Sequence, residues 1–294
     1  MTSPKKYSTD FVLSKDGTKI GYRQMGEGSG IILLHGGMNA SQNLMKLAEF
    51  LANEFTLYIP DRRGRGLSGL IGENYGLLKE CEDLQALINK TKVQKIFGHS
   101  FGAIITLQTA LLDSSIKKIA LYEPPIPVNG TNPASWVNNY EMAMSEGNIG
   151  KAMISIVKGT GDSSFLGILP EFITVPFMNF AIKAEAKEVK GDDVSLKTLI
   201  ETMHFDPKAV MESKGIIEKC KNMTADVLLL GGQKSQQYLK IALDALSATL
   251  KQSKLVEFSG IGHLAADNGG KPKIVAEELK KFFGTNRKIK STNR

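Results

Sequence analysis

The sequence predicts an α/β protein in which strands and helices alternate along the chain, with one long helical insertion. Short apolar runs that suit buried strands alternate with longer segments whose apolar residues recur every three or four positions, as on one face of a helix. This alternation stops after residue 125 and resumes at residue 226. Alternating strands and helices favour a mostly parallel sheet with helices on both faces.

The strands are predicted from apolar runs and turn signals. Residues 11–13 and 19–24 flank Asp16 and Gly17, a dipeptide typical of a tight hairpin turn. Residues 31–34 are entirely apolar, as in a strand buried on both faces. The expected strands are residues 11–13, 19–24, 31–34, 55–59, 93–97, 117–121, 226–230 and 254–258.

The helices of the alternating part are expected to be amphipathic. Leu44, Leu47, Ala48 and Leu51, for example, have the spacing of one helix face. The expected helices are residues 41–53, 75–89, 103–112, 237–250 and 272–283.

Residues 126–223 interrupt the alternation with helix-like segments and no clear strand. About 100 residues are far too many for a bare loop, so we expect a helical cap inserted into a core made of residues 1–125 and 224–294. Most methionines and aromatic residues of the cap should pack it onto the core, and some should line an apolar pocket. They are Trp136, Tyr140, Met142, Met144, Met153, Phe165, Phe172, Phe177, Met178, Phe180, Met203, Phe205 and Met211.

Composition indicates a soluble globular protein. A chain of 294 residues can bury a full core, and 42% apolar and 23% charged residues are ordinary shares. No apolar run is long enough for a membrane span, and no apolar segment follows the N-terminal lysines as in a secretory signal. Cys81 and Cys220 suggest reduced thiols, so we expect a cytoplasmic location.

The net charge of +7 raises the question of a nucleic-acid or membrane partner. The two ends of the chain carry six of these charges and the remainder is close to neutral. A small cluster of Arg62, Arg63 and Arg65 belongs to a turn after a strand. We therefore expect neither kind of partner. The charged residues at the ends are Lys5, Lys6, Arg287, Lys288, Lys290 and Arg294.

The strongest chemical signal is a G-x-S-x-G pattern at residues 98–102, centred on Ser100. A strand-like run precedes it and a helix-like run follows. A serine at such a sharp turn is held on a strained backbone with its hydroxyl exposed. Side chains at Gly98 or Gly102 would crowd the neighbouring elements. Ser100 is therefore the candidate nucleophile.

A nucleophilic serine needs a base, and the chain has four histidines. His263 follows a late strand, from which its loop can reach over the sheet, so it is the candidate base; the alternative is a histidine that stabilises the loop. His99 adjoins the serine, but the turn should point it away. His35 is expected to brace a loop, and His204 lies in a helix-like segment with a smaller chance of touching substrate.

The base needs an orienting acid between the serine and the histidine in the chain. One natural place follows the strand 226–230, but Ser235 stands there and no carboxylate is near. The other follows the strand 117–121, where Glu123 precedes two prolines that stop the strand. Glu123 is the candidate acid, and a surface glutamate is the alternative.

An oxyanion intermediate needs fixed N–H donors. The residue after the nucleophile, Phe101, should supply one. Gly37, in the loop after the strand 31–34, should supply the other, since glycine lets the backbone approach the substrate closely. An ordinary glycine turn is the alternative for Gly37.

The order of residues 35–37, 61–68, 98–102 and 262–263 resembles the α/β-hydrolase superfamily over nearly the whole chain apart from the insert and the ends. The resemblance implies a mostly parallel eight-stranded sheet with helices on both faces. Ser235 at the usual acid position resembles members whose acid follows the sixth strand, such as some haloalkane dehalogenases and the zearalenone-type lactone hydrolases. Dehalogenases use an aspartate nucleophile, so Ser100 argues against their chemistry.

These residues predict a serine hydrolase acting on a small or medium apolar ester, lactone or thioester. C–C bond hydrolysis and acyl transfer by the same residues remain open, as does a non-catalytic ligand-binding protein on the same scaffold. No metal or organic cofactor is expected, since no metal-ligand cluster is evident. The oligomeric state is left open.

Overall fold

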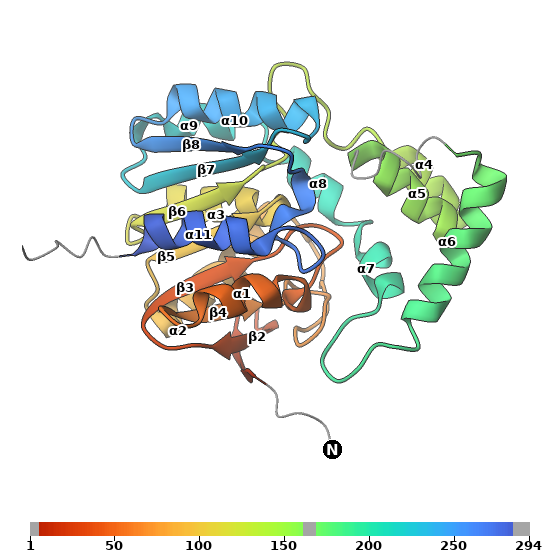
Figure 1. The fold of residues 1–294 in the computed structure, drawn as a ribbon, viewed down its shortest axis with the longest axis horizontal. Coiled ribbons are helices and arrows are strands. Elements are labelled where there is room, and N and C mark those ends of the chain that lie inside the picture. The colour runs from red at the N-terminus through yellow and green to blue at the C-terminus, as the bar shows by residue number, and fades with distance from the viewer. Residues whose placement is uncertain (1–5, 161–168, 285–294) are drawn as a thin grey trace, which may run out of the picture.

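The structure is a computed structural model that describes residues 6–160 and 169–284. An eight-stranded sheet runs through the core in the order β1-β2-β4-β3-β5-β6-β7-β8 (Figure 1). β2 is antiparallel to β1 and β4, and the remaining neighbours are parallel. This confirms the predicted fold class. The strands are β1 (Ser8–Leu13), β2 (Lys19–Met25), β3 (Ser29–Leu34), β4 (Phe55–Pro60), β5 (Lys95–His99), β6 (Lys118–Tyr122), β7 (Asp226–Gly232) and β8 (Ser253–Phe258).

Helices cover both faces of the sheet. α2 (Leu77–Thr91), α3 (Phe101–Leu112) and α10 (Gln237–Thr249) pack on one face with the larger apolar cluster. α1 (Met45–Leu51) and α11 (Pro272–Phe283) pack on the other face, against each other and a second apolar cluster. The fully apolar strands predicted from the sequence lie between these two layers, where both of their faces are buried.

Several boundaries differ from the sequence prediction by a few residues, and two of these differences change the local structure. The segment expected as one helix at residues 41–53 is a 3₁₀ helix, η1 (Ser41–Leu44), followed by the shorter α1. β5 begins two residues later than expected because α2 runs on to Thr91, and Lys92 then turns the chain with a positive φ of 59°. The shift makes His99 the last residue of the strand and places Ser100 in the turn.

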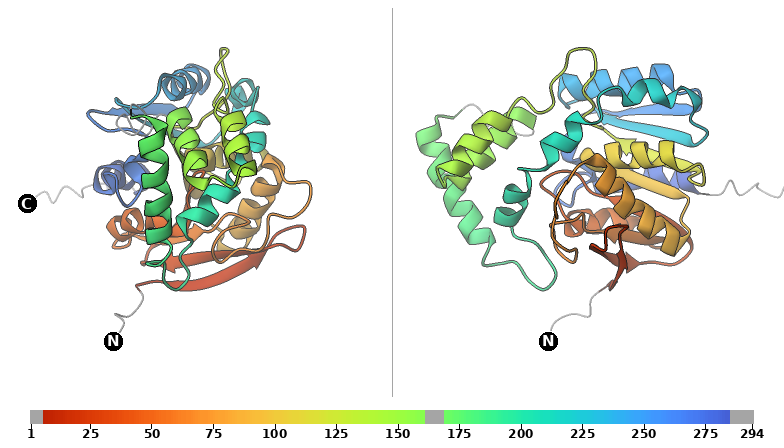
Figure 2. Two further views of the ribbon diagram at one scale, coloured as in Figure 1. Left: turned by 90° about the vertical axis from the view of Figure 1, so that its right-hand side faces the viewer. Right: turned by 180° about the vertical axis from the view of Figure 1, so that it is seen from behind.

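Helices fill the described part of the insert. They are α4 (Val137–Ser145), α5 (Ile149–Thr160), α6 (Glu171–Glu185), α7 (Leu196–Thr202), α8 (Asp206–Met211), α9 (Ile216–Lys219) and the 3₁₀ helix η2 (Cys220–Asn222). Figures 1 and 2 show α4, α5 and α6 as an outer layer, with α7 and α8 between that layer and the sheet. The outer layer has its own apolar cluster, whereas α9 and η2 pack into the main core. The domain boundaries at residues 126 and 223 stay a prediction.

The expectation that the aromatic residues of the insert pack inward is wrong for part of α6. Phe172, Phe177 and Phe180 are 78%, 59% and 72% exposed. The inward face of α6 carries Met178 and Ile182 instead, four residues apart, so the three phenylalanines fall on the opposite side. Met142 of α4 is also exposed.

Some predictions concern residues outside the described part of the chain. These are Phe165 and the charges at Lys5, Arg287, Lys288, Lys290 and Arg294. Within residues 6–160 and 169–284, no helix is both long and apolar enough to cross a membrane.

Candidate active site

Ser100 lies in the turn between β5 and α3. Its backbone has φ 54° and ψ −120°, a strained conformation for a residue with a side chain. A Cβ atom at Gly98 would clash with the carbonyl oxygen of Gly102, and one at Gly102 would clash with the carbonyl oxygens of Leu34 and His35. The two glycines of the sequence pattern are therefore required by the close approach of the backbone around the serine.

Three predicted residues meet at this turn. His263 begins the 3₁₀ helix η3 (His263–Ala266) after β8, and Glu123 directly follows β6. The Nε2 atom of His263 lies 3.0 Å from Ser100 Oγ, and its Nδ1 atom lies 2.7 Å from Glu123 Oε2. A continuous hydrogen-bonded chain thus joins carboxylate, imidazole and hydroxyl, the arrangement that a nucleophilic serine requires.

The Glu123 carboxylate is fully buried and fixed on both oxygens. Its Oε1 atom accepts the backbone N–H of Gly232 at 2.5 Å, while Oε2 faces His263. Burial raises the pKa of this carboxyl, but the contacts with His263, Ser235 and Gly232 outweigh burial, so the pKa lies below its ordinary value. Glu123 is therefore set up to carry a negative charge beside the imidazole.

Ser235 lies near the same carboxylate. Its buried hydroxyl makes no hydrogen bond of good geometry among the described residues, yet it is close enough to Glu123 to help lower the pKa of that carboxyl. The commoner acid position after β7 therefore holds a hydroxyl that faces the acid supplied by β6.

The two predicted oxyanion donors face the same cavity as the serine. Gly37 and Phe101 line it together with Ser100 and His263. Their N–H groups have no backbone acceptor within the described parts of the chain. A Cβ atom at Gly37 would come within 3.1 Å of Asp206 Oδ2, so this position is crowded from the side of the insert.

The other three histidines have different surroundings. His35 is buried and donates from Nδ1 to the carbonyl of Gly36, while its Nε2 accepts the N–H of Arg62. It thus braces the loop after β3, as expected, and also ties that loop to the turn after β4. Burial holds the pKa of His35 well below the ordinary value. His204 is exposed, pairs with Glu141, and does not line the serine cavity. His99 contacts the backbone of His263, a contact that the sequence analysis missed.

The arginine cluster predicted at a turn is buried and paired. Arg62 bonds Glu80 at 2.7 Å and Asp206 at 2.8 Å, and Arg65 bonds Asp206 at 2.9 Å. Although burial raises the pKa of Asp206, the two guanidinium groups lower it to about 2. Asp206 belongs to α8 and the arginines to the core, so this cluster ties the insert to the core beside the serine cavity.

Arg63 is buried on the other side of the same turn. It bonds Asp83 at 2.6 Å and Asp16 at 3.1 Å. All three guanidinium groups are therefore buried in ion pairs.

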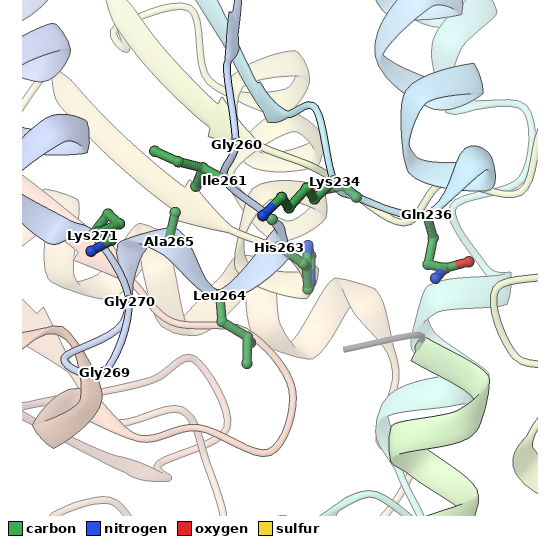
Figure 3. Close-up of a pocket in the computed structure, with 12 residues that line it drawn as sticks. Lys234, Gln236, Gly260, Ile261, His263, Leu264, Ala265, Gly269, Gly270 and Lys271 are labelled. Carbon is green, nitrogen blue, oxygen red and sulfur yellow. The ribbon is translucent and has the colours of Figure 1, made fainter. Parts of the chain in front are cut away.

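Two cavities meet at His263. The first is small, about 60 Å³, and is lined mainly by apolar groups from both the core and the insert. Its remaining lining residues are Pro125, Pro133, Ala134, Trp136, Thr160, Met203, Pro207, Val210 and Tyr238. The second, about 490 Å³, borders the loop around Gly260, Leu264 and Lys271 (Figure 3).

No group of three or more histidine, cysteine, aspartate or glutamate side chains in the described residues could hold a metal ion. Cys81 and Cys220 are free and buried, and burial raises both thiol pKa values to about 12.

Comparison with known proteins gives a consistent picture. The family model of the alpha/beta hydrolase fold matches residues 31–149. Over 118 residues the chain is 31% identical to an uncharacterized hydrolase, YraK, from Bacillus subtilis, a match to 39% of this chain and 44% of that protein. It is 28% identical over 116 residues to a cis-3-alkyl-4-alkyloxetan-2-one decarboxylase from Shewanella oneidensis, covering 37% and 36% of the two chains. The matches thus span less than half of these curated relatives.

Solved structures match over nearly the full length. An α/β hydrolase from Sphaerobacter thermophilus has a TM-score of 0.74 at 24% identity, and the match covers 93% of this chain and 100% of the hydrolase. An esterase from Exiguobacterium antarcticum has a TM-score of 0.67 at 21% identity, with 94% and 99% covered. The eight-stranded sheet, the serine turn and these neighbours together show that the chain has the α/β-hydrolase fold, and the family match over residues 31–149 agrees with it.

Proposed function

We propose that this protein is a serine hydrolase that cleaves a small or medium apolar ester, lactone or thioester through an acyl-enzyme. The observation that carries the proposal is the hydrogen-bonded chain from Glu123 through His263 to Ser100. A neutral serine hydroxyl is a weak nucleophile, and a base within hydrogen-bond reach activates it. The same chain of contacts counts against a non-catalytic ligand-binding protein.

In the acylation step, Ser100 Oγ attacks the carbonyl carbon and its proton passes to Nε2 of His263. The charge of Glu123 stabilises the imidazolium that results. When the tetrahedral intermediate collapses, the bond to the leaving oxygen or sulfur breaks and Nε2 returns the proton to it. In a lactone, the leaving hydroxyl remains attached to the acyl group.

In the deacylation step, water attacks the acyl-enzyme and gives a proton to Nε2 of His263. The bond to Ser100 then breaks, the serine oxygen recovers that proton, and a carboxylic acid is released. The N–H groups of Gly37 and Phe101 would hold the oxyanion in both steps, because both line the cavity at the serine.

The size of the serine cavity favours a short acyl group. About 60 Å³ leaves room for only a few water-sized groups, and the lining is mostly apolar. The insert supplies Trp136 and Met203 to this lining, so we propose that it acts as a cap that sets the length of the acyl group. His263 also lines the larger cavity, which we propose as the side from which water enters.

The names of the relatives fit an ester or lactone carbonyl. One solved neighbour is an esterase, and the name of the Shewanella relative describes the reaction of a four-membered lactone. We also propose that the partner is a small molecule, because Arg62, Arg63 and Arg65 are buried in ion pairs. The cytoplasmic location stays a prediction.

A panel of p-nitrophenyl esters with acyl chains of increasing length tests the proposal. We expect turnover that is fastest for the shortest chains and is lost in Ser100→Ala. The proposal would be contradicted if the wild-type protein hydrolysed no ester of this panel and also no lactone or thioester of similar size.

A further inference from the structure

Two residues that directly precede proposed catalytic residues lie side by side in the sheet. His99 ends β5 and precedes Ser100, and Tyr122 ends β6 and precedes Glu123. The two are register partners across the parallel strands. Their rings meet edge to face with centroids 5.6 Å apart, and both side chains are buried.

Both side chains donate a hydrogen bond to the loop that carries His263. Tyr122 Oη donates to the carbonyl oxygen of Gly262 at 2.8 Å. The Nε2 atom of His99 lies 2.9 Å from the carbonyl oxygen of His263. Because a carbonyl oxygen can only accept, Nε2 of His99 must carry the proton. The two acceptors belong to the peptide groups before and after the Cα atom of His263, so the backbone is held on both sides of this residue.

The other nitrogen of the His99 ring, Nδ1, lies 3.4 Å from Asp267 Oδ1 without a hydrogen bond of good geometry. The Tyr122 ring also stacks on Phe258, at the end of β8, with centroids 6.4 Å apart. The donors are thus rigidly placed by the sheet, whereas the acceptors lie in the loop.

Other hydrogen bonds hold the loop on either side of His263: Lys234 N–H donates to the carbonyl oxygen of Ile261, and Asn39 Nδ2 donates to Asp267. Gly260 has a φ of 69°, and Gly262 lies directly before His263. Glycines give a loop large conformational freedom. The loop borders the cavity of about 490 Å³, and Gly260, Ile261 and His263 are among the lining residues that Figure 3 draws. Packing therefore cannot hold the loop from that side.

We propose that His99 and Tyr122 are positioning residues that fix His263 against Ser100. The inference rests on the proposed function, since it assigns their role in that reaction. Ser100 and Glu123 directly follow strands of the sheet. The hydrogen bonds from His99 and Tyr122, which end the same strands, fix the position of His263 relative to them. A displacement of about 1 Å of a reacting group can cost about 10²-fold in rate, so these two hydrogen bonds should matter for turnover.

Four variants test this role in the full-length protein. Tyr122→Phe removes one hydroxyl and keeps the ring. His99→Leu removes the other donor, and His99→Gln keeps an N–H at similar reach. Tyr22→Phe is the matched control, because it removes a buried phenol that donates to Asp10 near the far edge of the sheet.

We expect kcat for ester hydrolysis to fall about tenfold or more in Tyr122→Phe and His99→Leu, with KM within about twofold of wild type. His99→Gln should recover much of the loss, and Tyr22→Phe should keep the wild-type kcat. If His99→Leu does not fold, Tyr122→Phe and His99→Gln still decide the question. Wild-type kcat in Tyr122→Phe would overturn the proposal, whatever the change in Tm.

Hydrogen exchange separates this inference from the proposed function. Amides of residues 259–267 should exchange faster in Tyr122→Phe than in wild type, and at the wild-type rate in Tyr22→Phe. If the wild-type protein hydrolyses no ester, the proposed function fails and the exchange rates alone decide whether the two donors hold the loop. Wild-type exchange rates for residues 259–267 in Tyr122→Phe would then overturn the positioning role of the two donors.

Discussion

Glu123 reaches His263 from the end of β6, with its Oε2 atom 2.7 Å from Nδ1, across 140 residues of sequence. The end of β7, where the acid of such a site more commonly lies, offers only Ser235. The hydroxyl of Ser235 lies near the Glu123 carboxylate and helps to lower its pKa. One carboxylate therefore contacts the histidine, and the other position holds a serine near that carboxylate.

This relationship predicts unequal effects of two substitutions. Glu123→Gln keeps the size of the side chain but removes the charge that orients and stabilises the imidazole, so kcat should fall by about 10³- to 10⁴-fold with little change in KM. Ser235→Ala should be mild, within about tenfold, because the carboxylate keeps its contacts with His263 and Gly232. Steady-state kinetics on one ester measure both. A large loss of kcat in Ser235→Ala together with a small loss in Glu123→Gln would contradict the assignment of Glu123 as the acid.

The lining of the serine cavity predicts which methionine of the insert controls acyl length. Met203 lines the cavity, whereas Met178 does not, although both are 6% exposed and belong to one apolar cluster. Met203→Ala should raise the ratio of kcat/KM for a hexanoyl ester over an acetyl ester by roughly tenfold. Met178→Ala should leave that ratio unchanged.

Both methionine variants should lose stability, by about 2–5 kcal/mol, because each removes a buried side chain. Urea unfolding gives this loss, so the comparison separates specificity from folding. The same chain-length ratio in the two variants would contradict the role of the insert as a cap.

The ion pairs between insert and core predict a large and a small loss of stability. Asp206→Asn removes the carboxylate that pairs with Arg65 and one of the two that pair with Arg62, which should lower the free energy of unfolding by about 3–5 kcal/mol. Asp193 pairs with Arg23, which is buried, but Asp193 itself is 41% exposed at its side chain, so Asp193→Asn should cost less than Asp206→Asn. Equal losses in urea unfolding would show that the buried cluster is no stronger than the pair with the partly exposed Asp193.

Two buried histidines predict that stability falls on mild acidification. Burial lowers the pKa of His35, which faces Arg62, Arg65 and Asp206, and the pKa of His99, which faces Asp267, His263 and Glu123. A lowered pKa means that the folded state binds fewer protons than the unfolded state at the same pH. The contribution to stability is therefore fully present above the unfolded pKa of about 6.5 and is lost progressively as the pH falls below that value.

Each such histidine contributes up to about 1.4 kcal/mol per pH unit in that range. Urea unfolding at several pH values between 8 and 5, with imidazole titration followed by NMR, measures the effect. A free energy of unfolding that stays constant over this range would contradict the neutral state of both rings.

Local patterns predicted most of the fold and of the site. The apolar runs predicted all eight strands, and the G-x-S-x-G pattern placed Ser100 at the end of β5. The geometry at His263 and Glu123 agrees with the roles expected of them, because chain order and the ends of parallel strands limit where a base and an acid can lie.

Contacts between distant segments could not be predicted in this way. Asp206 stands in an ordinary helix and gives no local sign that it pairs with Arg62, 144 residues away. The exposed face of α6 carries phenylalanines, which are typical of a core, so composition wrongly predicted that this face is buried. His99 was assigned no role because its acceptor is a backbone carbonyl, which every residue has.

The central claim is that Ser100 is a nucleophile activated by His263. Mass spectrometry of the protein after treatment with a fluorophosphonate tests it most directly, since the reagent modifies only activated serines. We predict one covalent adduct, on the peptide that contains Ser100, formed rapidly in wild type, at least about 10³-fold more slowly in His263→Ala, and absent in folded Ser100→Ala. An unmodified Ser100, or an adduct on another residue with esterase activity retained in Ser100→Ala, would contradict the account.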